Sequence, residues 1–370
     1  MVRVPGLAIA AGGLGLAAWA VRAGRPVPDA IGGRATGARA ARMQASPEWS
    51  GGRFHNQQLQ FEPSSRTLAG SVKELVAGRQ ERHPVGDVPL VREPPVPRPV
   101  GTHVTWLGHS TVLVQVDGAV LLLDPVWSER CSPSQQVGPR RIHPVPVALR
   151  DLPPVDAVVI SHDHYDHLDM DSVKELAAVR RETRFVVPLG VGAHLEKWGV
   201  PADRIDELDW HESTDVAGTR LVATPAQHFS GRGLSRDGTL WASWVVEGES
   251  GKVFYSGDTG YFVGFAEIGD RYGPFDVSLV QVGAYDDGWP TIHMTPEHGV
   301  EAHLDVRAGV MVPVHWGTFN LAFHPWSEPV ERLLVEAERR GATVVVPRPG
   351  ERVDVAALPS APTCWWRSVT

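Results

Sequence analysis

Between residues 102 and 350 the chain consists of short apolar runs separated by polar segments that contain glycine and proline. The runs are rich in β-branched residues and are bounded by turn-forming residues, a pattern typical of buried strands. The dipeptide Asp117-Gly118 between the second and third runs is a hairpin signal. We predict strands at residues 103–107, 111–116, 119–123, 155–160, 185–187, 220–224, 241–246, 252–255, 277–282 and 310–314.

Helical spacing marks a second set of segments. Residues 171–181 carry apolar side chains with the period of one helix face. The segment Thr295-Pro296-Glu297 is a typical helix start, because it combines a capping hydroxyl, an early proline and an early carboxylate. Residues 327–340 predict the last long helix, and residues 71–80 predict a short one. Two successive runs of strands and helices favour a layered α/β domain.

The N-terminus has a different pattern, with an uncharged stretch rich in glycine and alanine at residues 4–21. Its length is at the lower limit for a membrane span. One arginine precedes the stretch and five follow it by residue 42, which favours a retained anchor with the rest of the chain in the cytoplasm. The segment Ala18-Trp19-Ala20 also suits a signal peptidase, so export after cleavage is the alternative.

The residues between this stretch and the first strand lack a strong periodicity. Residues 22–50 are rich in glycine, alanine and arginine and predict a flexible basic linker that anionic lipid headgroups would attract. Six prolines between residues 83 and 101 predict an extended connector. The predicted organisation is a hydrophobic anchor or signal at 1–22, a linker and Pro-rich N-terminal extension at 23–101, a main domain at 102–350 and a C-terminal tail at 351–370.

Composition narrows the class of protein. A chain of 370 residues can bury a large core, and its formal net charge of −8 argues against a general nucleic-acid binder, which usually carries a basic face. The two cysteines, Cys131 and Cys364, cannot form a disulfide framework. The sixteen histidines are more informative, since about half of them lie in short motifs that follow apolar runs.

The densest of these motifs follows the fourth predicted strand. It has the sequence His162-Asp163-His164-Tyr165-Asp166-His167. Imidazole and carboxylate groups at this density suit a divalent cation such as zinc. In extended backbone His162 and His164 point to the same side. A sharp turn after Tyr165 would direct Asp166 and His167 toward a second cation.

Later strands also end in residues that can bind metal. His228, Asp258 and His315 each follow a predicted strand within four residues. A lone histidine at a strand end is more often an ordinary hydrogen-bonded residue, so each is a weak signal alone. Asp124 ends a strand as well and is suited to accept a hydrogen bond from a ligand imidazole, or else is a plain turn residue. His109, near the first hairpin turn, is expected to support the site.

The motif His-x-His-x-Asp-His after an apolar strand resembles the signature of the metallo-β-lactamase superfamily. The later order of His, Gly-Asp and His is similar to the superfamily's remaining ligands. The resemblance implies an α/β fold of the αββα type, in which two mixed β-sheets face each other and helices flank them. It implies two zinc ions, one held by His162, His164 and His228, the other by Asp166, His167 and His315, with Asp258 bridging both. Ligand type alone does not separate zinc from manganese or iron.

Segments outside the metal motif resemble the phospholipase D family that hydrolyses N-acylphosphatidylethanolamine. The resemblance runs from about residue 54 to about residue 350, and at Asp163 the mammalian lipid enzymes carry an asparagine instead. The matching segments include Phe54-His55-Asn56, Trp106-Leu107-Gly108-His109-Ser110-Thr111, Gly138-Pro139-Arg140-Arg141, Glu207-Leu208-Asp209-Trp210, Gly257-Asp258-Thr259-Gly260-Tyr261 and His315-Trp316-Gly317-Thr318-Phe319.

This resemblance implies that a metal-bridging hydroxide hydrolyses a phosphodiester, with a phospholipid as substrate and a membrane surface as partner. Asp166 and Asp258 would be catalytic through the metals. His293 matches the family's position for a substrate-phosphate contact and could bind the phosphate or protonate the leaving alkoxide. Tyr165 lies inside the metal motif and would reach the substrate, or else is a packed ring with a satisfied hydroxyl.

Three other functions are open to this fold. A lactonase or another carboxylic-ester hydrolase would need the same metals but a site shaped for a planar carbonyl. A diiron redox protein would usually replace a ligand with an extra carboxylate and add a flavin domain, neither of which the sequence contains. A binding module without metal would lack a ligand, and none of the seven is missing. The sequence does not indicate an oligomeric state.

Overall fold

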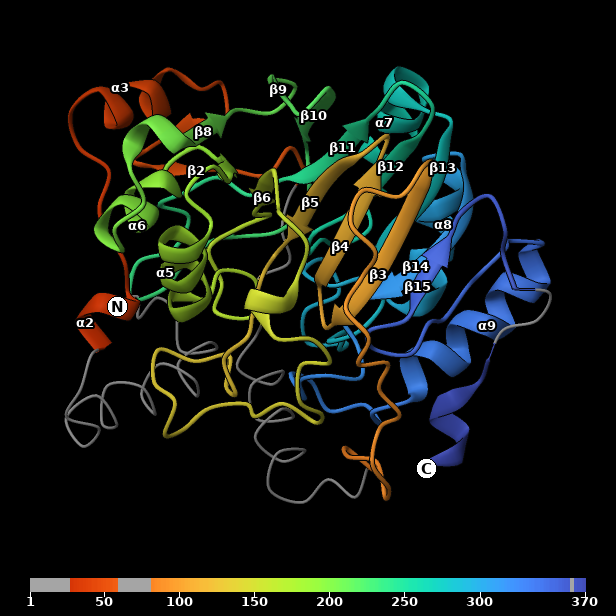
Figure 1. The fold of residues 1–370 in the computed structure, drawn as a ribbon. Helices are drawn as coiled ribbons and strands as arrows, with labels where there is room; N and C mark the ends of the chain where they lie inside the picture. Colours follow the sequence, from red (N-terminus) through yellow and green to blue (C-terminus); the bar gives the residue numbers. More distant parts are fainter. Residues whose placement is uncertain (1–26, 59–80, 360–362) are drawn as a thin grey trace, which may run out of the picture.

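The computed structural model describes residues 27–58, 81–359 and 363–370. Two mixed β-sheets pack face to face with helices on their outer sides (Figure 1), so the predicted αββα arrangement is confirmed. The first sheet has seven strands in the order β15 (Arg352–Asp354), β3 (Thr102–Gly108), β4 (Thr111–Val116), β5 (Ala119–Leu123), β6 (Ala157–Val159), β7 (Arg184–Pro188) and β8 (Ile205–Leu208). The second has six in the order β14 (Ala308–Val314), β13 (Phe275–Gln281), β12 (Lys252–Tyr255), β11 (Ser243–Glu247), β10 (Thr219–Thr224) and β9 (Ser213–Val216).

The helices lie against the outer faces of these sheets. Leu176 and Leu195, from the two helices of the first sheet, share one buried cluster with Leu113 of β4. Val300, on the helix that follows β13, packs in the large core cluster of the second sheet. The helices are α5 (Met170–Val179) and α6 (Gly192–Lys197) on the first sheet, and α7 (Gly264–Tyr272), α8 (Pro296–Asp305) and α9 (Glu328–Arg340) on the second.

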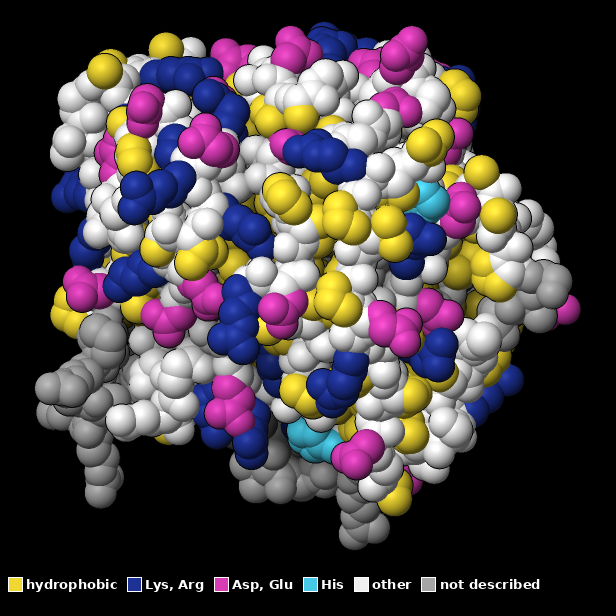
Figure 2. Space-filling model, viewed as in Figure 1, with side chains coloured by type: hydrophobic (Ala, Val, Ile, Leu, Met, Phe, Trp, Pro, Cys, Tyr) yellow, Lys and Arg dark blue, Asp and Glu magenta, His cyan; other side chains and the backbone are white. Residues whose placement is uncertain are grey.

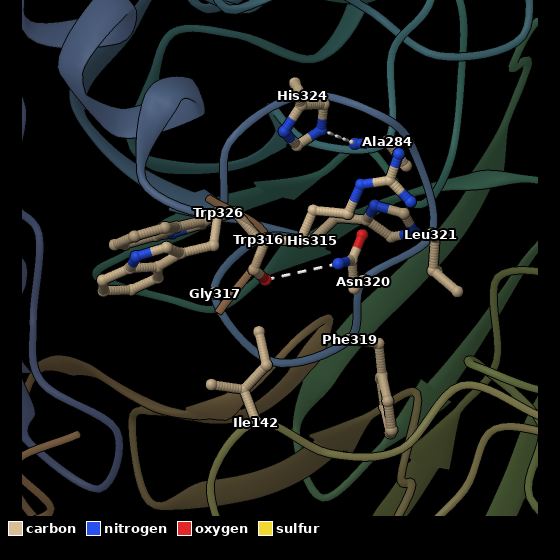
Figure 3. Close-up of a pocket in the computed structure, with 11 residues that line it drawn as sticks. Ile142, Ala284, His315, Trp316, Gly317, Phe319, Asn320, Leu321, His324 and Trp326 are labelled. Carbon is tan, nitrogen blue, oxygen red and sulfur yellow. Dashed lines mark hydrogen bonds between the residues drawn. The ribbon is translucent and has the colours of Figure 1, made fainter. Parts of the chain in front are cut away.

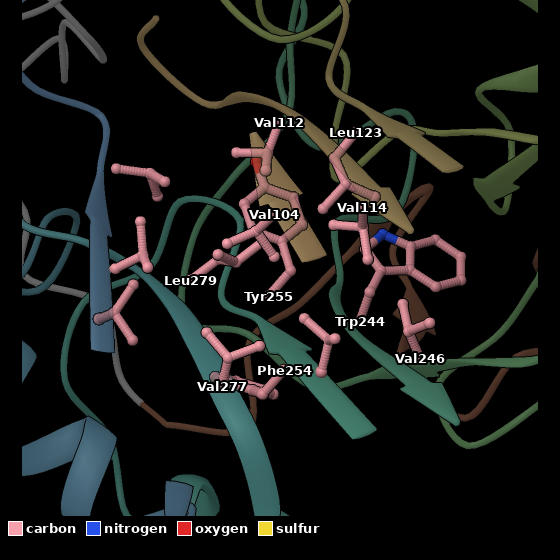
Figure 4. Close-up of a cluster of buried hydrophobic side chains, with 14 of the residues drawn as sticks. Val104, Val112, Val114, Leu123, Trp244, Val246, Phe254, Tyr255, Val277 and Leu279 are labelled. Carbon is pink, nitrogen blue, oxygen red and sulfur yellow. The ribbon is translucent and has the colours of Figure 1, made fainter. Parts of the chain in front are cut away.

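The central strands are buried on both faces, which explains their continuous apolar runs. In β4, Val112 and Val114 point into the core between the sheets, while Leu113 between them points to the outer helices. Figure 4 shows Val112 and Val114 of the first sheet facing Trp244 and Phe254 of the second. This double burial fixes the register of the strands, and with it the positions of the loops at their ends.

The strands and helices predicted within residues 102–350 are confirmed to within a few residues. Asp117 and Gly118 have positive φ angles of 51° and 85°, as the hairpin turn between β4 and β5 requires. Thr295 caps α8 by accepting a hydrogen bond from the His298 backbone N–H at 3.3 Å. The sequence did not predict β8, β9, α6 or α7. Residues 83–101 contain no helix or strand, as expected for a connector.

The predicted flexible linker is wrong for residues 27–50. Helices α2 (Val27–Ala30) and α3 (Gly37–Ala45) and the short pair β1 (Trp49–Ser50) and β2 (Arg53–Phe54) fold against the domain. Arg39 forms ion pairs with Glu207 at 2.5 Å and with Glu196 at 2.7 Å. Met43 is buried in the core. At least one arginine that the composition suggested would attract lipid headgroups therefore binds carboxylates instead. We call residues 27–56 the N-terminal arm.

The predicted C-terminal tail is also part of the folded domain. Strand β15 pairs with β3, with Val353 opposite Val104. Trp366 is fully buried and packs edge-on against Trp316, with ring centroids 5.8 Å apart. The domain therefore continues past residue 350, at least through the residues described in this region.

The proposed anchor or signal at residues 4–21 and the predicted helix at 71–80 lie outside the described residues. Among the helices that the structure does describe, none has the length and apolar character needed to cross a bilayer. Figure 2 shows one face of the molecule, on which basic and acidic side chains are interspersed with scattered apolar ones.

Candidate metal centre

The segment that follows β6 forms a compact turn before α5, and we call residues 162–168 the metal loop. The backbone N–H groups of His167 and Leu168 both donate to the carbonyl of His164, at 3.1 and 2.8 Å. The turn therefore comes where the sequence predicts it, just after Tyr165. It sends His162 and His164 to one side and Asp166 and His167 to the other.

The first cluster of candidate ligands joins the two sheets. His162 and His164 from the metal loop meet His228, from the loop after β10, and Asp258, from the loop after β12. One ligand atom from each of these residues lies within 4.8 Å of all the others. Three of the side chains belong to the predicted first zinc, and the fourth is the predicted bridge.

The second cluster lies on the other side of Asp258. It contains Asp166, His167 and His315, as the sequence predicts, together with His109. Asp258 Oδ2 lies 3.1 Å from His167 Nε2 and 3.0 Å from His315 Nε2. Asp258 therefore stands between the two clusters, which is the position a bridging carboxylate needs.

Burial and charge divide the ring nitrogens into two groups. Burial lowers the pKa of His162 and of His228 well below the ordinary value, so both rings are neutral and offer lone pairs. His167 and His315 differ from these two. Burial opposes protonation of His167, but the nearby carboxylates, with Asp258 as the largest contributor, raise its pKa well above the ordinary value. Burial and the carboxylates Asp258 and Asp166 act against each other at His315 as well, and the carboxylates raise its pKa to about 9. This half of the centre attracts positive charge, which a divalent cation would supply in place of protons.

The residues present fit a metal site on both sides of Asp258. His167 Nε2 and Asp258 Oδ1 are buried and have no hydrogen-bond partner. In the first cluster, His164 Nδ1 lies 2.8 Å from His162 Nε2 and 3.3 Å from His228 Nε2. Nitrogen ligands of a tetrahedral zinc ion stand about 3.3 Å apart, because each lies about 2 Å from the metal. The clusters therefore suit metal, while the full ligand set stays a prediction.

Asp124 supports the centre from behind, as the sequence predicts. Its carboxylate accepts a hydrogen bond from His167 Nδ1 at 2.6 Å, from the Ser161 backbone N–H at 2.7 Å and from the Ser161 hydroxyl at 2.5 Å. The Tyr255 hydroxyl donates to it as well, which the sequence did not reveal. Because Asp124 fixes the Nδ1 proton, His167 must offer Nε2 to the metal side.

His109 and His293 flank the second cluster. His109 Nε2 lies 3.0 Å from Asp166 Oδ2, and its backbone carbonyl accepts the backbone N–H of His315 at 2.9 Å. The expected support by His109 is therefore visible as two contacts to candidate ligands. His293 Nδ1 has no hydrogen-bond partner and lies 3.9 Å from Asp258 Oδ2. Burial lowers the pKa of His293 to about 3, so its ring is neutral.

Tyr165 is placed differently from the expected substrate contact. Its hydroxyl donates to the backbone carbonyl of Arg232 at 2.7 Å, and its ring packs beside the apolar cluster of Val126, Cys131 and Phe319. The packed ring with a satisfied hydroxyl, which the sequence left open, describes this arrangement. Contact of this half-buried residue with substrate stays a prediction.

Asn56 is a further supporting residue, which sequence reasoning used only as a family match. Its side chain accepts from the backbone N–H of His228 at 3.0 Å and donates to the His228 carbonyl at 2.7 Å. Trp241 Nε1 donates to the same amide oxygen. This pair of bonds fixes the backbone of one candidate ligand from the N-terminal arm. No periodicity or spacing links residue 56 to residue 228, so only the motif Phe54-His55-Asn56 could have pointed to it.

A pocket opens beside the second cluster. Figure 3 shows His315 and Trp316 on one side of it and the loop from Gly317 to Trp326 around it, with His324 bonded to the backbone N–H of Ala284 at 3.0 Å. Most of the labelled side chains are apolar or aromatic. Polar groups of His315, Asn320 and His324 line this pocket together with aromatic side chains, so the neighbour of the metal centre on the side of His315 is mixed in character.

Fold and centre together define a class of enzyme, a metal-dependent hydrolase with two facing sheets and candidate ligands in the loops that follow its strands. The sequence model of the β-lactamase superfamily domain matches residues 120–316. The chain belongs to this superfamily.

Individual relatives agree with this assignment. An uncharacterized protein of Mycobacterium tuberculosis is 51% identical over 98% of both chains. The N-acyl-phosphatidylethanolamine-hydrolyzing phospholipase D 1 of Caenorhabditis elegans is 41% identical over 60% of this chain and 65% of the worm enzyme. Igni18, a metallo hydrolase from the archaeon Ignicoccus hospitalis, has a TM-score of 0.53 at 25% identity, over 68% of this chain and 97% of its own. The resemblance inferred from the motifs is confirmed.

Proposed function

We propose that this protein is a dinuclear zinc phosphodiesterase that cleaves N-acylphosphatidylethanolamine, or a related phospholipid, in the manner of a phospholipase D. The observation that carries the proposal is the pair of ligand clusters on either side of Asp258, together with the neighbouring His293, whose Nδ1 has no hydrogen-bond partner. The 41% identity to the worm phospholipase D supports the substrate class.

When bound, two zinc ions would lower the pKa of water and neutralise developing charge on a phosphate. The carboxylate of Asp166 is half-buried, whereas that of Asp258 is buried between the clusters. The residues proposed to hold the ions are His162, His164 and His228 for one, Asp166, His167 and His315 for the other, and Asp258 for both.

The half-buried residues indicate the side from which substrate approaches. His164, Asp166 and His293 are partly exposed, whereas His162 and His167 are buried. On the same side the half-buried ring of Phe229 lies edge-on to His164, with centroids 4.4 Å apart. An aromatic side chain next to the metal ligands favours a substrate with an apolar part over a fully hydrated one.

His293 is proposed to act on the substrate and not on a metal. Its ring stacks on His315, with centroids 5.1 Å apart, and stands edge-on to His228 at 5.3 Å. It thus borders both clusters while its Nδ1 stays unpartnered. From this position a neutral imidazole can donate a hydrogen bond to a phosphate oxygen, and it could pass a proton to the leaving alkoxide only after first taking one up to become an imidazolium.

The decisive experiment is the hydrolysis of several substrates in water labelled with heavy oxygen. Purified protein would be offered N-acylphosphatidylethanolamine, soluble phosphodiesters, lactones and carboxylic esters. We expect label in the phosphate of a phosphatidic acid product, because the proposed attack is at phosphorus. Label in a carboxylate would instead establish the lactonase or carboxylic-ester alternative.

We also propose that residues 4–21 keep the enzyme at a membrane, with the catalytic domain in the cytoplasm. Two of the five arginines that follow this stretch, Arg39 and Arg42, form ion pairs with carboxylates, so fewer of them are left to attract lipid headgroups. The proposal therefore rests mainly on the apolar stretch itself. N-terminal sequencing of membrane and soluble fractions tests it, and a mature N-terminus at Val21 in a soluble exported fraction would show cleavage instead.

A further inference from the structure

Arg232 is a buried cation directly beneath the metal loop. Only 6% of the residue is exposed, and its guanidinium group donates to three backbone carbonyls from two distant parts of the chain. Nε donates to Ala30 at 2.9 Å, and one terminal nitrogen donates to Asp163 and to Leu168, both at 2.7 Å. Among the described residues no carboxylate lies within ion-pair distance of it, and Asp163, Asp169 and Asp166 favour its charge only from farther away.

Two aromatic rings complete the surroundings of this charge. The guanidinium carbon lies 4.0 Å from the ring centroid of Tyr165 and 4.9 Å from that of Trp198. A guanidinium group that lies over two aromatic rings is attracted to both and is restricted in its orientation. Lysine could not reproduce this geometry, because the contact depends on a planar group with several fixed donors.

The turn that contains Arg232 also holds the metal loop in other ways. The Gly231 backbone N–H donates to Asp163 Oδ1 at 2.7 Å, and the Tyr165 hydroxyl donates to the Arg232 carbonyl at 2.7 Å. The loop is therefore held at Asp163, Tyr165 and Leu168, the positions between and just after its candidate ligands. None of these contacts uses a ligand side chain.

We propose that Arg232 is a positioning residue for the first metal cluster. It stands four residues after His228 and bonds the loop that carries His162 and His164. One side chain thus sets the distance between ligands that come from different sheets. This inference rests on the proposed metal centre, and it assigns a role to a residue that contacts neither metal nor substrate.

The N-terminal arm takes part in the same arrangement. Besides the Ala30 carbonyl bound by Arg232, Trp198 Nε1 donates to the Asp29 carbonyl at 2.7 Å, and Lys197 donates to the Gly32 carbonyl at 3.0 Å. The arm is thereby fastened to α6 and to the arginine together. Arg232 links the arm, the metal loop and the segment of His228 in a single set of contacts.

The test compares zinc affinities of Arg232→Gln and Arg232→Lys with the wild type, measured by competition with a chromophoric chelator. We expect binding to the first cluster to weaken by about 10- to 100-fold in both variants, the range for loss of a group that orients ligands. Binding to the second cluster is expected to change less. The lysine variant keeps the charge but loses the planar fork, so it separates geometry from charge.

Arg204→Gln is the matched control. Arg204 also donates to three carbonyls, those of Thr183, Ala177 and Arg180, and lies 5.5 Å from the ring centroid of Phe185. It performs the same kind of backbone binding but makes none of these contacts to the metal loop. We expect this variant to melt at a lower temperature with unchanged zinc affinity.

The outcomes separate the two proposals. If both Arg232 variants lose thermal stability like Arg204→Gln but bind zinc as the wild type does, Arg232 is only structural and the inference is wrong. If Arg232→Gln does not fold, the lysine variant decides by the same criterion. A wild-type protein that binds no zinc at these histidines would overturn the metal centre itself, and the positioning role with it.

Discussion

At the scale of single residues, the properties of the candidate ligands depend on side chains that touch no ion. His167 can present Nε2 to the second cluster because Asp124 holds its Nδ1 proton at 2.6 Å. The side chain of Asn56 binds both the backbone N–H and the backbone carbonyl of His228. Such outer contacts fix the orientation and tautomer of a ligand, and they add to its basicity.

Asp124→Asn tests this dependence. Asp124 has a positive φ of 37°, which asparagine tolerates well, so the change removes the carboxylate with little strain on the backbone. The new amide can no longer accept from His167, Ser161 and Tyr255 together. We expect zinc affinity to fall by about 10- to 100-fold, measured by chelator competition.

Asp156→Asn is the control for that variant, since Asp156 also accepts a backbone N–H near a strand end, from Val120 at 2.8 Å, but lies outside the metal clusters. Its zinc affinity should equal that of the wild type. Unchanged affinity in Asp124→Asn would mean that the carboxylate does not orient His167.

A second residue-scale prediction separates substrate contact from metal binding. His293→Ala should keep both metals but lower phosphodiester turnover by about 10²- to 10⁴-fold, the range for loss of one positioned acid–base group. His315→Ala should lose a metal together with activity. Elemental analysis and turnover of both variants would be measured side by side.

The structure makes the reverse assignment worth testing, because one ligand atom each from Asp258, His293 and His315 lies within 4.8 Å of the others. If His293→Ala loses a metal while His315→Ala keeps two, the roles are exchanged. If neither change affects diester cleavage, the reaction takes place elsewhere.

The sequence could predict candidate ligands but few of their supports. The ligand positions carry a spacing signal, since they follow strands that are themselves apparent from apolar runs. Arg232 and Tyr255 carry none, because their partners lie far away in the sequence and are met only in the folded chain. Tyr165 shows that a position in the motif can also mislead. Its place there suggested a contact with substrate, whereas its hydroxyl donates a hydrogen bond to the backbone carbonyl of Arg232.

At the scale of elements, prediction succeeded where burial is complete and failed where it is partial. Strands such as β5 are buried on both faces and therefore consist of unbroken apolar runs. Strand β8 contains Asp206 and Glu207 and is mostly half-buried, so it lacks that signal. Helix α6 has only six residues, too few for a clear period. The N-terminal arm was missed because its ion pairs join residues more than a hundred positions apart.

The packing of α8 on β13 gives a prediction about pH. His303 of α8 is almost fully buried and its Nδ1 lies 2.8 Å from the Ser278 hydroxyl of β13. Burial lowers the pKa of His303 from 6.5 to about 4. The unfolded chain therefore binds a proton more readily between these pH values. Stability from the neutral ring is fully present above about pH 6.5 and is lost as the pH falls toward 4.

The lowered pKa of His303 corresponds to a loss of at most about 3 kcal/mol in the free energy of unfolding on acidification. Denaturant unfolding across this pH range should show His303→Gln losing less stability on acidification than the wild type. His55→Gln, in the N-terminal arm, serves as the control for removing a histidine outside this core. Parallel acid dependence of the His303 variant and the wild type would contradict the prediction.

At the scale of the whole molecule, the candidate centre depends on the two sheets being held together. The metal loop leaves the first sheet after β6, whereas His228, Asp258 and His315 follow β10, β12 and β14 of the second. The apolar core between the sheets sets their separation, so core packing and ligand spacing are linked. The pattern of strands and helices favoured a layered α/β domain, but only the family resemblance implied two facing sheets, since no local pattern tells which sheet a strand joins.

Metal removal should therefore destabilise the whole molecule. Ions bound by loops of both sheets cross-link them and bind only the folded chain, which stabilises it by about 2.7 kcal/mol when free metal is 100 times the dissociation constant. We expect the melting temperature of chelator-treated protein to be lower by several degrees and to rise steadily as zinc is restored. His228→Ala, which removes a ligand from the second sheet, should show a smaller rise. A melting temperature that does not respond to zinc in the wild type would mean that no metal joins the sheets.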